Sequence, residues 1–370
     1  IIRGLVGSEM CIRDRSCSVI VGNMQRNVFF VPRPEILSKD ADSIEELEQK
    51  VAEGDKQARG ELMRLLHGKL ADLKDEVRSI LTRRGVTKFT LVPVKRDYAF
   101  EVAGVPKGMQ WVIKVKYSAQ LPELAESETA GEHFCGMFGA KTSISEHLIL
   151  KRKLKGPGWL KVSNPSRVPQ ERQITWSKQE YQVDSPKLVS VSEEAHSHPP
   201  LTVAAVNLKT YVAPNQTTPE IISCTVMYLK QVQTDLPTPK DQWNTLRQLR
   251  HFSCVRRLEG QPFPVGFERE CQQRNASNVG KLNNNSVISH FNSERALLCN
   301  VVARLKALDP DVLVGHNVLA FDLDVMYRRM IHLKVPHWSR LGRMKRSQMP
   351  YGTDKKKSSS FGNTLVGSTI

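Results

Sequence analysis

The stretch that decides the fold is SERALLCNVVARLKALDPDVLVGHNVLAFDLDVMYRRM, residues 293–330. Its first half repeats apolar residues every three or four positions after Ser293-Glu294, which predicts a capped helix that stops before Asp309-Pro310. Residues 311–314 then predict a short buried strand, and a second helix is expected through Met330. This order of helix, strand and helix is typical of an α/β layer fold.

Two apolar runs upstream, residues 201–208 and 220–230, predict the first hairpin of the same domain. His196, His198 and two prolines precede them, and we interpret this segment as a solvated linker rather than a metal site, because no third ligand lies nearby. The sequence thus predicts an N-terminal domain over residues 16–198 and a second domain over 199–370. In the latter, residues 235–241 and 268–285 are polar stretches expected at the surface.

The N-terminal domain is predicted to mix strands and helices. Residues 17–32 carry a hairpin signal around Gly22-Asn23. Residues 43–81 predict one or two amphipathic helices, with a capping box at Ser43 and a break between Gly54 and Gly60. The further elements expected are strands at 88–94, 98–102, 110–118 and 159–162 and a helix at 145–151.

The composition favours an anionic partner. The chain has 54 Lys and Arg against 38 Asp and Glu, a formal charge of +16, and nucleic acid is the usual partner for such an excess, although ribosomal, membrane-surface and heparin-binding proteins share it. Its seven scattered cysteines form no Cys-x-x-Cys pair, which excludes a zinc ribbon and favours reduced thiols in a cytosolic or nuclear protein. No apolar run approaches the ~20 residues that span a bilayer, so no membrane partner is expected.

Both ends are expected to be incomplete. Residues 1–15 lack an initiator Met and fail as a signal peptide, so we interpret them as a non-native or disordered leader that contributes nothing to the fold. Leu365 to Gly367 resemble the opening of a strand just before the chain stops.

Residues 309–324, DPDVLVGHNVLAFDLD, resemble the second exonuclease motif of family B DNA polymerases: Asn, three residues, an aromatic and Asp. The motif residues are Gly315, His316, Asn317, Phe321 and Asp322. HWSRLGRMKRSQM at 337–349 resembles the stretch that follows this motif in a eukaryotic replicative member. Segments 97–103, 115–119 and 154–162 resemble the N-terminal domain of the same member, in order.

The resemblance implies an α/β (α+β) chain with an N-terminal β/α domain and a ribonuclease-H-like exonuclease domain. It further implies that the parent is a nuclear DNA-directed DNA polymerase that extends RNA primers, with DNA template, RNA–DNA primer, primase and an accessory subunit as partners. The parent polymerase would use Mg²⁺, whereas no cofactor is expected in this part, which lacks the palm motifs.

The resemblance also predicts a degenerate proofreading site. Family members that excise nucleotides bind two metal ions through an Asp-x-Glu on the first strand and the Asp of the second motif. Here Asn207 and Lys209 stand at the first two positions, and Asp322 alone keeps its carboxylate. A metal pair needs clustered carboxylates and an ammonium repels cations, so we expect no catalysis. An active 3′ to 5′ exonuclease, or a basic binding protein without a polymerase module, are the alternatives.

Asp322 then needs another role, and we expect it to cap the helix that follows or to pair with a basic neighbour. Gly315-His316-Asn317 is interpreted as a turn into that helix. His316 could act as a general base, but the sequence offers it no nucleophile.

A run of cations follows the motif. Trp338 stands beside Arg340, Arg343, Lys345 and Arg346, a mixture of stacking surface and phosphate-seeking donors that nucleic-acid grooves use. A solvated loop explains the run equally well, and the lysines at 355–357 could form a nuclear-import signal.

Overall fold

In the computed structural model, the described residues are 16–98, 102–125, 128–154, 156, 158–193, 200–214, 218–232, 249–278 and 286–347. Several expectations fall on residues outside these ranges, namely 1–15, 99–101, 196, 198, 235–241, 279–285, 355–357 and 365–367. Contacts divide the chain into two compact units. Unit 1 comprises 1–20, 158–183 and 191–370, and unit 2 comprises 21–157 and 184–190. This is a division by packing, and the boundary at residue 198 stays a prediction.

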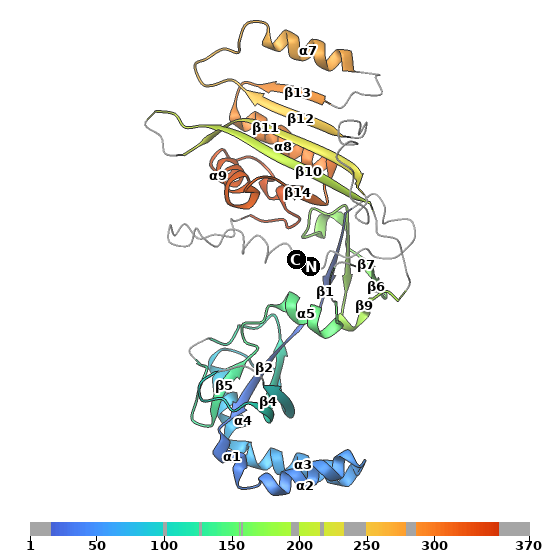
Figure 1. The fold of residues 1–370 in the computed structure, drawn as a ribbon, viewed down its shortest axis with the longest axis vertical. Coiled ribbons are helices and arrows are strands. Elements are labelled where there is room, and N and C mark those ends of the chain that lie inside the picture. Colours follow the sequence, from blue (N-terminus) through green and yellow to red (C-terminus); the bar gives the residue numbers. More distant parts are fainter. Residues whose placement is uncertain are drawn as a thin grey trace. The chain divides into compact units, whose positions relative to one another are not determined.

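Unit 2 is built on a four-stranded antiparallel sheet of order β3-β4-β2-β5 (Figure 1). Its strands are β2 (Gln25–Pro32), β3 (Phe89–Tyr98), β4 (Gly108–Ser118) and β5 (Phe134–Phe138), and its helices are α1 (Pro34–Ser38), α2 (Ala41–Ala52), α3 (Lys56–Lys69), α4 (Ala71–Arg83) and α5 (Ile144–Arg152). The core joins alternate residues of β2 and β4 to the apolar stripe of α4, with Phe30 edge-on to Phe134 at 5.0 Å.

Two local predictions for unit 2 were wrong, namely the capping box at Ser43 and the one or two helices over residues 43–81, where the structure has three. Helix α2 begins at Ala41 after Asp40, not at a Ser43 capping box. Gly60 lies inside α3, and the second break falls at Leu70, which is fully buried and lies between α3 and α4. The break near Gly54 is confirmed, because Gly54 leaves α2 with φ +96°, a conformation open to glycine at little cost.

The hairpin predicted over residues 17–32 was also wrong. Asn23 does adopt the left-handed turn conformation, with φ 50°, but β1 (Cys17–Val21) joins a sheet of order β1-β8-β7 whereas β2 pairs with β4 and β5. The turn signal was therefore right and the pairing was not, because strand pairing follows the faces that each strand must bury.

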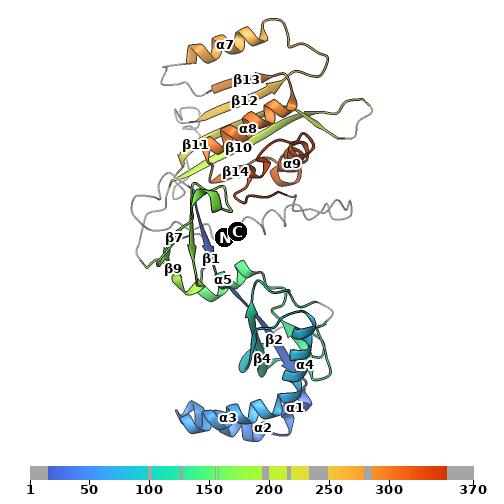
Figure 2. The same ribbon diagram turned by 180° about the vertical axis from the view of Figure 1, so that it is seen from behind.

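Unit 1 contains a five-stranded mixed sheet of order β13-β12-β11-β10-β14 (Figures 1 and 2). Its strands are β10 (Leu201–Tyr211), β11 (Glu220–Val232), β12 (Arg250–Arg256), β13 (Ser286–Phe291) and β14 (Val312–Val314). The antiparallel pairing of β10 with β11 confirms the predicted hairpin. Strand β14 runs parallel to β10 and is half-exposed, because β10 is its one partner among the strands that the structure describes, so the buried strand expected there was wrong.

Two helices pack against this sheet. Helix α8 (Glu294–Leu308) begins at the predicted cap, where the Ser293 Oγ accepts from the Ala296 N–H at 3.3 Å, and ends at Asp309. Helix α9 (Leu323–His332) follows a π-helical turn, Val318–Asp322. The core contains Ala204, Val206 and Leu208 of β10. Because side chains alternate along a strand, the residues between them lie on the other face.

Unit 1 has further elements beyond these strands and helices. Helix α7 (Phe267–Asn278) occupies part of the stretch that was expected only as polar surface. Its Asn275 side chain exchanges hydrogen bonds of 2.7 and 3.0 Å with the backbone of Ile288, and so covers the outer edge of β13. The short elements of unit 1 are β6 (Leu160–Val162), β7 (Ser166–Arg167), β8 (Gln179–Val183) and 3-10 turns at Gln170–Arg172 and Trp338–Leu341. The 3-10 turn at Pro186–Leu188 belongs to unit 2, and β9 (Val189–Val191) spans the division at residue 190.

Among the described residues, no helix combines the length and apolar character needed to cross a bilayer.

Candidate functional site

The three positions expected at a degenerate exonuclease centre come together in unit 1. Asn207 and Lys209 are exposed on β10 and flank the buried Leu208. Asp322 is buried where the π-helical turn meets α9, and its carboxylate accepts a hydrogen bond from the backbone N–H of Leu208. Asp322 is the one residue of the three that has a carboxylate. It therefore lies against Leu208, the strand residue between Asn207 and Lys209.

The motif before Asp322 is shaped by close packing. Gly315 lies so near β10 that an added Cβ would approach the Val206 carbonyl oxygen to 2.9 Å, so a side chain is excluded there. Asn317 adopts a left-handed conformation with φ 54°, which asparagine tolerates better than most residues. Its carbonyl accepts from the Phe321 N–H at 2.9 Å and closes the turn. The expected turn at these residues is confirmed.

Asp322 is not a helix cap. Its backbone is already helical and its side chain makes no capping bond to α9, because the carboxylate is turned toward β10 instead. Burial raises the pKa of Asp322, while the Leu208 N–H and the nearby His316 partly oppose that rise. Because these two groups offset the effect of burial only in part, the carboxyl of Asp322 is harder to ionise here than in water.

These residues do not fit a pair of hard metal ions. Mg²⁺ and Mn²⁺ prefer clustered oxygen ligands, whereas the three positions supply one carboxylate, one amide and one ammonium. In the part of the chain that the structure describes, no group of three His, Cys, Asp or Glu side chains could hold a metal.

The cation run that follows α9 pairs with a distant segment of the same unit. Thr175 forms a β-bridge with Met344, the Trp176 N–H donates to the Arg343 carbonyl at 2.7 Å, and the Lys345 N–H donates to the Ile174 carbonyl at 3.0 Å. The Trp176 indole also donates to Ser339 Oγ at 3.1 Å. Sequence reasoning missed this pairing, because nothing in either segment specifies the other.

Two of the predicted phosphate-binding residues are used inside the protein. Arg343 forms an ion pair with Asp309 and donates to the Pro310 carbonyl at 3.0 Å. Lys345 Nζ donates to the Gln173 carbonyl at 2.7 Å. Burial acts to raise the pKa of Asp309, but Arg343 and Ser16 together hold it below its usual value, so this ion pair is charged at neutral pH.

The other three residues have different environments. Trp338 packs on the core and meets Tyr327 edge-on at 5.7 Å, which leaves little of its ring for stacking on a base. The Arg340 guanidinium lies over the Trp176 ring, 4.4 Å from its centroid. Arg346 is half-buried, and its backbone N–H donates to Ser339 Oγ at 3.3 Å. Trp176 is thus the ring on which the Arg340 guanidinium stacks. Trp176 was not among the residues predicted from the sequence.

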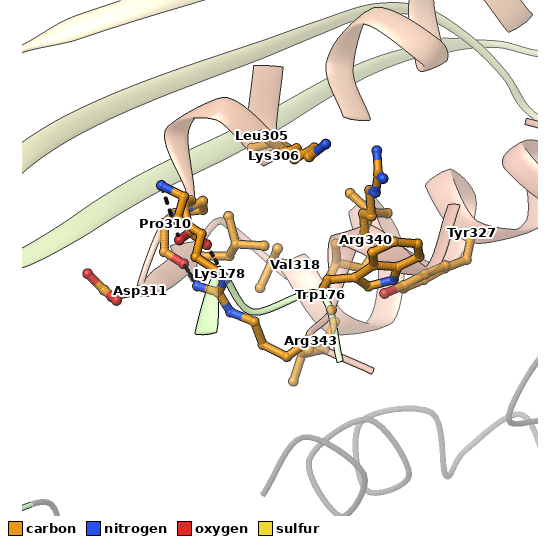
Figure 3. A pocket seen from close by; sticks show the side chains of 16 residues that line it. Trp176, Lys178, Leu305, Lys306, Pro310, Asp311, Val318, Tyr327, Arg340 and Arg343 are labelled. Carbon is orange, nitrogen blue, oxygen red and sulfur yellow. Dashed lines mark hydrogen bonds and ion pairs between the residues drawn. The ribbon is translucent and has the colours of Figure 1, made fainter. Parts of the chain in front are cut away.

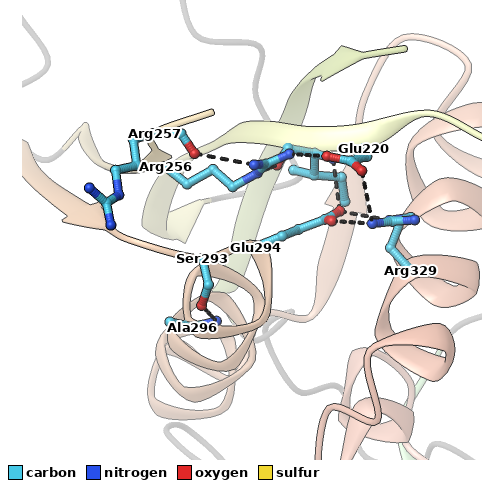
Figure 4. Close-up of polar contacts among 8 residues, drawn as sticks. Glu220, Arg256, Arg257, Ser293, Glu294, Ala296 and Arg329 are labelled. Atoms are coloured by element: carbon cyan, nitrogen blue, oxygen red, sulfur yellow. Dashed lines mark hydrogen bonds and ion pairs between the residues drawn. The ribbon is translucent and has the colours of Figure 1, made fainter. Parts of the chain in front are cut away.

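A second charged cluster fixes α9 to the sheet (Figure 4). Arg329 of α9 binds the Glu294 carboxylate through both Nε and Nη2, with both side chains buried. Glu294 also accepts from the Ile221 N–H at 2.8 Å. Glu220 lies 3.9 Å from Arg329 and 2.5 Å from Arg256, which completes the cluster. These residues therefore fix α9, which begins directly after Asp322, to the strands of the sheet.

Comparisons with known proteins agree with this fold and motif. The family model described as "DNA polymerase family B, exonuclease domain" matches residues 135–367. The chain therefore belongs to the family B DNA polymerases.

Within that family, the chain is similar to catalytic subunits of DNA polymerase alpha. The chain is 39% identical to the DNA polymerase alpha catalytic subunit of Oryza sativa subsp. japonica, over 97% of this chain and 23% of the relative. It is 41% identical to that of Arabidopsis thaliana, over 91% and 22%, and 32% identical to that of Mus musculus, over 94% and 21%. The chain spans about a fifth of the length of these relatives. A solved family B DNA polymerase from Pyrobaculum calidifontis matches with a TM-score of 0.42 and 18% identity, over 74% of this chain and 28% of that one.

Proposed function

We propose that this chain is the part of a DNA polymerase alpha catalytic subunit that supplies scaffold and nucleic-acid contacts beside an exonuclease-like site that no longer cuts. The observation that carries the proposal is the position of Asp322 against Leu208, between Asn207 and Lys209. Two-metal hydrolysis stabilises the attacking and leaving oxygens with two cations. One carboxylate beside an ammonium cannot hold them.

The whole protein, on this proposal, extends RNA primers by DNA-directed DNA synthesis in the nucleus. Its partners would be the DNA template, the RNA–DNA primer, primase and the accessory subunit, and Mg²⁺ would act in the polymerase domain. Support comes from the identity to DNA polymerase alpha catalytic subunits along almost all of this chain. Reading the transcript past residue 370 is expected to reveal palm motifs with paired aspartates, which a basic binding protein without a polymerase module would lack.

The proposed nucleic-acid contacts fall on the positive surface around Arg340 and Arg346 rather than on the whole cation run. Arg343 and Lys345 already have internal partners, and moving either to a phosphate would leave a half-buried Asp309 or a carbonyl without its donor. Among the described residues, no ion pair engages the guanidinium of Arg340 or that of Arg346. Phosphate contacts of this kind position a strand without reading bases.

The test incubates the purified chain with end-labelled single-stranded DNA and primed template in Mg²⁺ or Mn²⁺, with a proofreading family B polymerase as positive control. We expect binding without shortening, and the same result for Asp322→Ala. Metal-dependent degradation that Asp322→Ala abolishes would instead establish an active 3′ to 5′ exonuclease.

A further inference from the structure

A pocket of about 330 Å³ lies in unit 1 beside the C-terminal end of α8 (Figure 3). Its walls include Trp176, Lys306 and Arg340. Its floor is apolar and consists of Leu305, Leu313, Val318, Leu319 and Leu323. Ligand pockets span about 300–1,000 Å³, so this one has room for a single nucleoside-sized group on an apolar base.

The carboxylates at this pocket are already engaged. Asp309 pairs with Arg343, and Lys178 Nζ lies 3.6 Å from its other oxygen. Asp311 accepts from the Thr202 N–H at 2.9 Å. In Figure 3, dashed lines mark these ion pairs on the side where Lys178, Pro310 and Arg343 lie. The lining holds four cations, Lys178, Lys306, Arg340 and Arg343, against these two carboxylates, so an incoming anion meets a net positive charge.

Two cations of the pocket have no carboxylate. Among the described residues, no ion pair is formed by Lys306 or by Arg340, and the Nε of Arg340 is buried without a hydrogen-bond acceptor. Their terminal nitrogens lie on the same side of the pocket in Figure 3. Burial lowers the pKa of His337, and Arg340 and Lys306 lower it further. Both cations therefore lie close enough to His337 to affect its charge. A buried donor without an acceptor is costly, and an anion would satisfy it.

Trp176 holds this arrangement in place. Its ring carries the Arg340 guanidinium on one face, meets the His337 ring edge-on at 5.4 Å, and is anchored through its indole N–H to Ser339. Stacking on an indole orders a guanidinium without neutralising it. Arg340 is therefore a pre-positioned and still charged donor.

We propose that this pocket binds one nucleoside phosphate unit of a single-stranded nucleic acid, with the phosphate on Lys306 and Arg340 and the base or sugar on the apolar floor. The inference rests on the proposed function, because it names where a strand would be contacted. A single strand is favoured over a duplex, since only unpaired nucleotides can place a base in so small a pocket. A free nucleotide offers the same chemistry, so the test must separate the two sources.

The experiment measures binding of a fluorescent single-stranded oligonucleotide by anisotropy as salt is varied. The double variant Lys306→Gln with Arg340→Gln should bind about tenfold more weakly and reduce the salt slope by about 0.7, the value for one phosphate of a single strand. Its control, Lys230→Gln with Arg269→Gln, removes the same charge from exposed positions on β11 and α7 and should change neither quantity.

A second variant is needed because Arg340→Gln could weaken binding through lost packing around Trp176. Leu319 is 37% exposed on the pocket floor, so Leu319→Glu should fold and repel the phosphate, giving several-fold weaker binding. The fully exposed Val265→Glu is its control and should bind as wild type, whereas the uncharged Leu319→Gln should weaken binding less than Leu319→Glu does. Deoxynucleoside monophosphate at millimolar concentration should displace the oligonucleotide, whereas inorganic phosphate alone should do so less effectively.

The outcomes separate this inference from the proposed function. If the wild-type chain binds the oligonucleotide but both pocket variants match their controls, the pocket assignment is overturned while the proposed function stands. Saturable binding of the free nucleotide that leaves strand binding unaffected would overturn the assignment to a strand. A wild-type chain that binds no nucleic acid at all would overturn both.

Discussion

Asp322 keeps the carboxylate of its motif and, on the proposed function, has lost the catalytic role that the motif serves. In an active centre its charge would be shared with metal ions and further carboxylates. Here burial raises its pKa, and the Leu208 N–H and His316 offset that rise only in part. A residue kept for catalysis would gain from its charge, whereas this one carries the cost of burying it.

At this scale we predict that Asp322→Asn leaves stability unchanged or increases it at pH 7. The folded pKa of Asp322 lies above its unfolded value, so stability from the protonated carboxyl is complete below the unfolded pKa of about 3.9 and is lost as pH rises through the folded pKa. Asparagine keeps an acceptor for the Leu208 N–H and has no charge to bury. Thermal melts from pH 4 to pH 8 should show the advantage of Asp322→Asn growing with pH and then levelling.

The matched control is Asp324→Asn on the same helix. Asp324 forms an i,i+4 ion pair with the exposed Arg328, so its loss should cost less than about 0.5 kcal/mol. A marked loss of stability in Asp322→Asn at neutral pH would contradict the interpretation, because it would mean that the carboxylate has a stabilising partner.

At the scale of elements, the position of α9 depends on buried charge as well as on apolar packing. Arg329 lies on a helix face that is otherwise filled by Val325, Met326 and Met330. Its bidentate bond to Glu294 links α9 to the first turn of α8. The same bond raises the pKa of Arg329, so its guanidinium stays charged.

We predict that Arg329→Met destabilises the chain by about 3–5 kcal/mol, because Glu294 would stay buried without its guanidinium. Adding Glu294→Gln should recover part of this loss, since glutamine can still accept from the Ile221 N–H and carries no charge. Urea unfolding of the single and double variants measures the difference. Arg328→Met, one position away and exposed, serves as the control and should change stability by less than about 0.5 kcal/mol; an equal effect of both arginines would exclude the cluster as an anchor.

For the molecule as a whole, the proposed function implies that the exonuclease-like unit has lost the ligands of a metal centre. We predict that Asn207→Asp with Lys209→Glu restores metal binding, since it places two carboxylates on either side of the residue that Asp322 contacts. Mn²⁺ at ten times its Kd should then raise the free energy of unfolding of the double variant by about 1.4 kcal/mol. A higher melting temperature in Mn²⁺ would show this. The wild-type chain should show no shift. A Mn²⁺ shift in the wild type that Asp322→Asn removes would refute the lost-metal proposal.

The sequence by itself determined the elements whose signals are local. Ser293 and the periodic apolar residues after it specify α8, and the alternation of Ala204, Val206 and Leu208 specifies which face of β10 is buried. The turn at Gly315 to Asn317 was predictable too, because a glycine at a close approach and an asparagine with positive φ are backbone requirements of those positions. The motif that placed the chain in its family lies in this locally specified part.

Only the tertiary structure decided which of the charged residues are free to bind a partner. The sequence presents Arg340, Arg343 and Lys345 as equivalent members of one basic run. In the structure Arg343 pairs with Asp309, and the bridge between Thr175 and Met344 brings the Gln173 carbonyl to Lys345. It likewise placed β1 and β2 in different sheets. The physical reason is the same in both cases: a hydrogen bond or ion pair between residues far apart in the chain leaves no periodic trace in either segment, because its partner is chosen by the packing of the whole unit.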